Sequence, residues 1–124
     1  MRIKLFIVSI ILLLSHQLFF AQPSIYRSQF TNLSGQIEGK IIDANTKNPL
    51  EYANVILFST KDSTMVAGVA SAANGRFVLD NIKPGIYNLK ISFMGYEPYE
   101  IKRLAITPKN LTISLGDIDL KPKD

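Results

Sequence analysis

Carboxylates come closest to a reactive arrangement among the side chains of this sequence. Oxygen ligands of this kind are what calcium prefers. The aspartates do not follow the D-x-D-x-D-G spacing of a calcium loop, so we predict no specific cation site. Asp117 and Asp119, two residues apart, would share one face of a strand, where a solvated edge is favoured over a metal site. The aspartates weighed here are Asp43, Asp62, Asp80, Asp117 and Asp119.

Nucleophilic and transition-metal chemistry lacks its usual residues. The 124-residue chain has no cysteine and a single histidine, His16, which lies in an apolar N-terminal segment. Beyond that segment the chain cannot assemble a Ser-His-Asp or Cys-His system, a thiolate or imidazole zinc site, or a facial iron triad. Glycine-rich phosphate loops are also absent. We therefore expect a protein that is not an enzyme and that holds no cofactor and no metal.

Aromatic stacking on a sugar or a nucleic acid is a further possibility, because "KPGIYNLKISFMGYEPYE" at 83–100 holds three Tyr and one Phe. In an extended chain its apolar and polar residues fall on opposite faces, which is typical of a half-buried antiparallel strand. Each large apolar side chain contributes roughly 1.5–3 kcal/mol when buried, so core is favoured over a platform. For Tyr96 and Tyr99 we leave both burial and exposure open, since each can keep its hydroxyl at the edge of the core. The predicted core row is Tyr87, Leu89, Ile91 and Phe93, against Asn88, Lys90 and Ser92.

The same period of two continues from Gly35 onward, and no segment shows the i, i+3, i+4, i+7 stripe of a helix. Turn residues separate the extended segments, and Asn74-Gly75 is the strongest hairpin signal because both residues tolerate positive φ. Six or seven short strands at this spacing predict an all-β fold, an antiparallel β-sandwich. The expected extended segments cover 36–43, 53–60, 65–71, 76–82, 87–93, 97–101 and 111–120.

The last of these segments changes phase. Leu111, Ile113 and Leu115 share one parity, whereas Ile118 and Leu120 share the other. A β-bulge would restore the phase, and glycine is the usual residue for one. We predict a bulge or a strand break at Gly116-Asp117.

Ile56 and Phe58 lie opposite the predicted core residues of their own strand, Val55 and Leu57. If exposed, the pair would form a small apolar patch for a neighbouring domain. The alternative, which we favour, is packing under a loop or under the lead-in segment. Together with the tyrosines left open above, the candidate interaction residues are Ile56, Phe58, Tyr96 and Tyr99.

The N-terminus has the pattern of a secretory signal peptide, with Arg2 and Lys4 before an apolar run at 5–20. An uncleaved membrane anchor is the alternative, because the run is only slightly shorter than the roughly 17–25 residues of a spanning helix. Removing the signal leaves 12 basic against 10 acidic residues, a net charge of about +2 without a basic stripe, so nucleic acid is not an expected partner. The predicted organisation is a signal peptide and its helix at 1–22, a flexible lead-in at 23–34, a sandwich at 35–121 and a tail at 122–124.

Several motifs together resemble the carboxypeptidase regulatory-like domain, a transthyretin-like (prealbumin-like) sandwich of seven strands. The resemblance covers nearly all of 37–120 and departs from the family at "ASAAN" (70–74), where a Thr-Asp pair usually precedes the glycine. The matching motifs are Gly39-x-Ile41-x-Asp43, Pro49-Leu50 with Ala53-x-Val55, Asn74-Gly75-Arg76-Phe77, Pro84-Gly85-x-Tyr87-x-Leu89 and Gly95-Tyr96.

Two stretches, "LFSTKDSTMVAG" and "LGDIDLKP", are similar to the N-terminal extension of TonB-dependent receptors and related outer-membrane β-barrel proteins of Bacteroidetes-type bacteria. This resemblance implies an exported, non-catalytic periplasmic module associated with the outer membrane. Its partner would be a plug or barrel domain or another envelope protein, and it would touch the membrane only through the signal segment or such a barrel. The sequence stops at Asp124 without a plug or a barrel, so a truncated receptor and a freestanding module both stay open.

Other functions of the fold family serve as alternatives. A freestanding exported ligand-binding or adhesion domain, for glycans, is the second hypothesis. Hydroxyisourate hydrolases of this fold need histidines and a characteristic C-terminal tetrapeptide, whereas this sequence ends "KPKD". Related intradiol dioxygenases need histidine and tyrosine iron ligands. We expect neither enzyme activity, and we expect a monomer.

Overall fold

Alternating apolar and polar residues form seven strands in the computed structural model, which describes residues 32–124. The predicted signal peptide with its helix, and most of the predicted lead-in, lie outside the described residues. The strands are β1 (Gly35–Asp43), β2 (Asn54–Ser59), β3 (Met65–Ala70), β4 (Arg76–Ile82), β5 (Gly85–Ser92), β6 (Tyr99–Ile106) and β7 (Thr112–Leu120).

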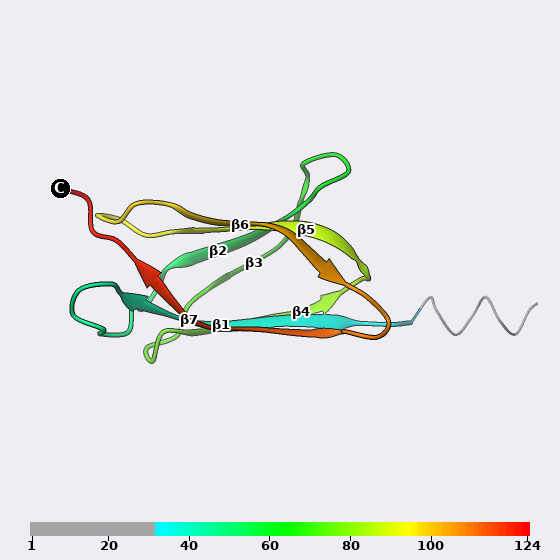
Figure 1. Ribbon diagram of the computed structural model, residues 1–124, viewed down its shortest axis with the longest axis horizontal. Helices are drawn as coiled ribbons and strands as arrows, with labels where there is room; N and C mark the ends of the chain where they lie inside the picture. Colours follow the sequence, from blue (N-terminus) through cyan, green and yellow to red (C-terminus); the bar gives the residue numbers. More distant parts are fainter. Residues whose placement is uncertain (1–31) are drawn as a thin grey trace, which may run out of the picture. The chain divides into compact units, whose positions relative to one another are not determined.

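The strands form two sheets that face each other, one in the order β4-β1-β7 and the other in the order β3-β2-β5-β6 (Figure 1). The buried residues of both sheets point into the space between them, as the period of two requires. All-β architecture with seven strands in two sheets was predicted from the sequence and is confirmed.

The core consists of the residues that the alternation selects. Within the row from β5, Leu89 and Ile91 are fully buried and Tyr87 is 7% exposed, so these aromatic and aliphatic side chains are core and not a stacking platform. The Tyr87 hydroxyl donates a hydrogen bond of 2.6 Å to the Lys83 carbonyl, which satisfies its one polar group. Phe93 is half-buried and packs against the same core.

One pairing departs from the predicted antiparallel arrangement. β1 and β7 lie side by side and run parallel, from the pair Gln36–Thr112 to the pair Asp43–Leu120. Parallel neighbours cannot be joined by a tight turn and need a long crossover connection. Here the other five strands form that connection, so no local turn signal constrains the relative direction of β1 and β7.

The Asn74-Gly75 turn is not a β-hairpin, in contrast to the prediction. β3 pairs with β2 and β4 pairs with β1, so this turn carries the chain from one sheet to the other. Of the two turn residues, Gly75 has a positive φ, of 80°, and Asn74 does not. The Asn74 side chain instead accepts a hydrogen bond of 3.0 Å from the Arg76 N–H. An Asx-type turn therefore replaces the two left-handed residues of a type I′ hairpin.

The predicted bulge in β7 is confirmed. Between the pairs Glu38–Ser114 and Lys40–Asp117, β1 advances by two residues and β7 by three. Gly116 has a φ of 67° there. The extra residue turns Ile118 and Leu120 into the core, where both are buried.

Within residues 32–124 the structure contains no helix of the length and apolar character that a membrane crossing requires.

Candidate interaction surface

The two residues predicted as an apolar patch lie on the outer face of the four-stranded sheet. Ile56 pairs with Gly68 and Lys90 across the neighbouring strands, and Phe58 pairs with Met65 and Asn88. Both side chains are half-buried, and Met65 beside them is 63% exposed. Ile56 and Phe58 thus contribute to an outward-facing apolar area at the centre of the sheet.

Tyr96 and Tyr99 lie elsewhere. Tyr99 pairs with the buried Ile91, so its side chain points to the core side of the sheet, and it is 37% exposed at the edge. Tyr96, in the loop after β5, is half-buried and packs against the core. The structure therefore does not bring the four candidate residues together into one surface.

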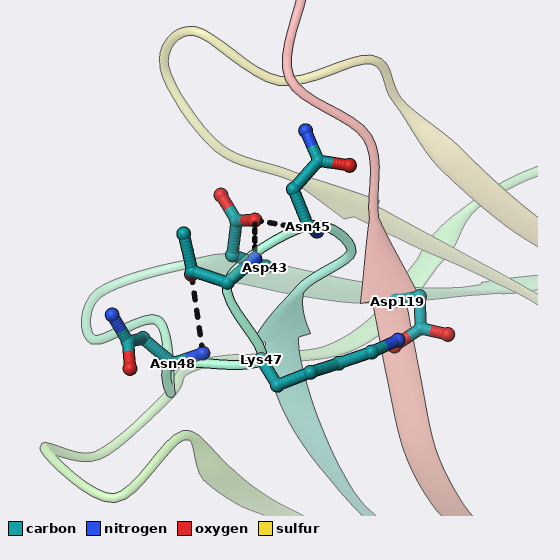
Figure 2. Close-up of polar contacts among 6 residues, drawn as sticks. Asp43, Asn45, Lys47, Asn48 and Asp119 are labelled. Carbon is teal, nitrogen blue, oxygen red and sulfur yellow. Dashed lines mark hydrogen bonds and ion pairs between the residues drawn. The ribbon is translucent and has the colours of Figure 1, made fainter.

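Asp43, at the end of β1, organises the loop that follows it (Figure 2). Its Oδ1 accepts hydrogen bonds from the Asn45 N–H at 2.7 Å and from the Thr46 N–H at 2.9 Å. The same loop is braced by an exposed ion pair, 3.3 Å from Lys47 Nζ to Asp119 Oδ1. Ion pairs of this exposure contribute little to stability, so the carboxylate of Asp43 is the main polar anchor of the loop.

The second oxygen of Asp43 connects this loop to Tyr96. The Tyr96 hydroxyl donates a hydrogen bond of 2.6 Å to Asp43 Oδ2. This bond, and then the backbone N–H of Thr46, hold the pKa of Asp43 below its ordinary value, because they stabilise the ionised carboxylate. The same bond to Asp43 raises the pKa of Tyr96. The final residues of two motifs, Gly39-x-Ile41-x-Asp43 and Gly95-Tyr96, are thus joined directly.

The C-terminal segment is held against the same loop. Pro122 forms an isolated bridge with Tyr96. The Glu97 N–H donates to the Lys121 carbonyl and the Lys123 N–H donates to the Gly95 carbonyl, each at 2.8 Å. Part of the predicted tail at 122–124 is therefore fixed to the sandwich through backbone bonds.

A groove of about 330 Å³ opens where these segments meet the outer face of the four-stranded sheet. We call it the lysine groove, because Lys90 and Lys123 line it and no carboxylate does. It also contains an aromatic pair, Phe93 and Tyr96, with ring centroids 5.5 Å apart. Its full lining is Asn54, Lys90, Ser92, Phe93, Met94, Tyr96, Pro98 and Lys123.

Of the residues that line this groove, only Tyr96 was predicted from the sequence as an interaction residue. Asn54, Lys90 and Lys123 come from β2, β5 and the C-terminal segment, and nothing local marks them as neighbours.

No group of three or more metal-ligating side chains comes together within residues 32–124. The carboxylates weighed for calcium are separated accordingly. Asp43 is engaged by its loop and Tyr96, and Asp62 accepts from the Thr64 N–H and hydroxyl. Asp117 and Asp119 are both exposed on β7.

Fold and site together define a β-sandwich of the transthyretin-like class. The model of the carboxypeptidase regulatory-like domain matches residues 36–121. The chain belongs to the carboxypeptidase regulatory-like domain family. No match was found among curated proteins.

Solved structures share the fold at low sequence identity. BcpA, the major pilin subunit of Bacillus cereus, is 22% identical with a TM-score of 0.56, covering 73% of this chain and 30% of the pilin. The Bacillus anthracis TIE protein is 17% identical with a TM-score of 0.55, covering 73% of this chain and 18% of that one. The 5-hydroxyisourate hydrolase of Klebsiella pneumoniae is 18% identical with a TM-score of 0.53, covering 70% of this chain and 86% of the hydrolase. This chain thus spans under a third of the length of the pilin, and the likeness concerns the fold alone.

Proposed function

We propose that this chain is a non-catalytic, exported module of the periplasm, with an interaction or structural role beside an outer-membrane β-barrel of the TonB-dependent receptor class. The observation that carries the proposal is the family match over residues 36–121. Two segments that resemble the receptor subset, around β2–β3 and around β7, support it, as does the signal-like pattern of the first 22 residues.

A non-catalytic role agrees with the chemistry of the described residues. Residues 32–124 contain no histidine and no cysteine. The two buried polar residues of this range, Asp43 and Ser71, are hydrogen-bonded within the fold. Asp43 accepts from the Asn45 N–H, and the Ser71 hydroxyl accepts from the Ala53 N–H and donates to the Leu50 carbonyl. Nucleophilic catalysis needs an activated side chain next to a base, and these groups are already engaged.

The partner that we propose is a plug or barrel domain or another envelope protein. The contact surface would be the outer face of the four-stranded sheet, where Ile56 and Phe58 are half-buried beside the exposed Met65. Surface apolar groups of this kind favour docking of another protein. The module would act as a monomer and would reach the membrane only through its signal segment or the associated barrel.

Export and location are tested by expressing the full chain with a C-terminal tag in its bacterial host and fractionating the cells. We expect a product in the envelope whose N-terminus, determined by mass spectrometry, begins after Ala21 or Gln22. A variant lacking residues 2–22 is the control and should stay in the cytoplasm. Recovery of the full chain in the cytoplasm would overturn the proposal.

The receptor context is tested separately, by reading the coding sequence beyond Asp124 and by cross-linking in the envelope. A continuing frame for a plug and barrel, or a cross-link to a barrel protein, is expected. Loss of that cross-link in Ile56→Ser/Phe58→Ser would locate the contact with the barrel on the outer face of the sheet. The control Lys61→Ser/Lys109→Ser, on the β2–β3 and β6–β7 loops, should keep the cross-link.

A freestanding exported ligand-binding or adhesion domain is the second candidate. It is favoured by the partial exposure of Tyr99 and by the aromatic side chains that line the lysine groove. A domain of this kind would be found in the envelope without any barrel protein cross-linked to it, and would bind a glycan by itself.

A further inference from the structure

We propose that the lysine groove binds an acidic sugar, a saccharide unit that carries a carboxylate. The groove has a volume of about 330 Å³, and its lining comes from β2, β5, the loop after β5 and the C-terminal segment. The inference does not depend on a neighbouring barrel, because every lining residue belongs to this chain.

The polar side of the groove is positively charged. Lys90 and Lys123 supply two ammonium groups, and Asn54 and Ser92, which pair across β2 and β5, add neutral donors. Glu100 is the cross-strand neighbour of Lys90 on β6. The ion pair between Lys47 and Asp119 is nevertheless the only one among residues 32–124. Both ammonium groups are therefore available for a carboxylate, which they bind through charge-assisted hydrogen bonds.

The remaining lining residues of the groove are mostly apolar. Phe93, Tyr96 and Pro98 line it, together with Met94, which is 94% exposed. Small-molecule sites combine an apolar lining with a few placed polar groups. Inorganic phosphate would use the lysines and leave these apolar residues unused, whereas a neutral sugar would leave the ammonium groups unused. A uronic acid uses both, because its ring presents C–H groups and its carboxylate presents the charge.

The groove is organised before any ligand arrives. Asp43 accepts the Tyr96 hydroxyl at 2.6 Å and holds that ring in place. The backbone of Lys123 is fixed by its N–H, which donates to the Gly95 carbonyl at 2.8 Å. Fixing the lining in advance lowers the entropic cost of binding.

A second hollow nearby has a mixed charge. It contains Tyr99 and Lys121, but also the carboxylates of Glu97 and Asp119. These carboxylates offset the charge of Lys121, so this hollow lacks the excess of positive charge that the lysine groove offers to an anion. Acidic sugar should therefore bind at Tyr96 and not at Tyr99.

The test is a titration of isotope-labelled protein, followed by amide NMR. The protein is expressed as the full chain and purified in whichever form, processed or unprocessed, the cells accumulate. Digalacturonic acid is the probe, at low ionic strength, and galactobiose and inorganic phosphate are the comparison ligands. We expect digalacturonic acid to shift the amides of Ser92, Tyr96 and Lys123, with a Kd on the order of 1 mM for so open a site.

Variants separate a specific site from general attraction by charge. Lys90→Gln/Lys123→Gln should raise the Kd about tenfold. The matched control Lys61→Gln/Lys109→Gln removes the same charge from loops outside the groove and should leave the Kd within about twofold. If the first double variant does not fold, the two single variants replace it, each with a smaller increase in Kd.

Three results would overturn the proposal. The first is a set of amide shifts that lies outside the groove, or no shifts at all. The second is equal binding of galactobiose or phosphate. The third is an equal loss of affinity in both double variants. None of these depends on where the protein resides in the cell, so the proposed envelope role could stand or fall separately.

Discussion

At the residue scale, Ser71 shows how a single hydroxyl joins two segments of the fold. Ser71 is 2% exposed. Its hydroxyl donates to the Leu50 carbonyl at 2.6 Å and accepts from the Ala53 N–H at 2.9 Å. It thereby connects the end of β3 to the turn before β2. Buried groups that lose such a partner cannot regain one from water.

Ser71→Ala should therefore destabilise the protein by about 1–3 kcal/mol, since it leaves both backbone groups without this partner. Chemical denaturation measures the change in the free energy of unfolding. Ser114→Ala on the exposed face of β7 is the control and should change it by less than about 0.5 kcal/mol. Equal effects of the two substitutions would contradict the role assigned to Ser71.

The bond between Tyr96 and Asp43 predicts a dependence of stability on pH. The folded-state pKa of Asp43 is lowered, first by the Tyr96 hydroxyl and next by the Thr46 N–H. An aspartate with a lowered folded pKa adds stability above its unfolded pKa, about 3.9, and this stability is lost as the pH falls through the folded value. Tyr96→Phe should thus destabilise the protein at pH 6 and progressively less at lower pH.

Denaturant midpoints measured from pH 6 to pH 2 test this difference. Tyr87→Phe is the matched control, because the Tyr87 hydroxyl donates to a neutral carbonyl, that of Lys83. Its destabilisation should not vary over this pH range. A Tyr96→Phe effect that is equally independent of pH would show that Asp43 is not the partner that matters in solution.

At the element scale, each of the four edge strands carries a bulge. In every pairing of an edge strand with a central strand, the ladder shifts and the extra residue lies in the edge strand. The pairing of the central strands β2 and β5 has no shift. Three of the four bulges contain a residue with positive φ: Asn81 in β4, Arg103 in β6 and Gly116 in β7. Bulged edges are poor templates for adding another strand.

Two glycines in left-handed conformations should respond differently to the same substitution. Gly116 has open space around the position of a Cβ, whereas a Cβ on Gly75 would clash with the Ile41 carbonyl oxygen. Gly116→Ala should therefore cost only the backbone penalty of about 1–2 kcal/mol. Gly75→Ala adds a steric clash and should cost clearly more. Thermal denaturation of both variants measures the order, and the reverse order would contradict this account of the two turns.

At the scale of the whole molecule, bulges on all edges predict a monomer. Because residues 32–124 present no flat edge strand, their edges are poor templates for a second copy to extend the sheets. Sedimentation equilibrium at concentrations up to about 0.5 mM should yield the mass of one chain. Association that does not extend the sheets would need an extensive complementary interface on the rest of the surface. A stable dimer would show that another surface, such as the area around Ile56 and Phe58, pairs with itself.

Much of this fold is predictable because its signals are local. The alternation of apolar and polar residues selects the core of each strand from neighbours two residues apart. The phase change in β7 revealed the bulge at Gly116 for the same reason. Pattern alone therefore determined the all-β class and the burial of Tyr87, Leu89 and Ile91, whereas the count of seven strands came from the family resemblance.

Tertiary structure decided what depends on distant partners. The parallel pairing of β1 and β7, and the passage of the Asn74-Gly75 turn between sheets, follow from which strands become neighbours, and that choice has no local signal. The bond from Tyr96 to Asp43 spans 53 residues of sequence. The lysine groove likewise exists only because packing of the two sheets and the C-terminal bridge place Asn54, Lys90 and Lys123 around one hollow. Contacts of this kind arise from burial of the whole core, which the residues around each position do not encode.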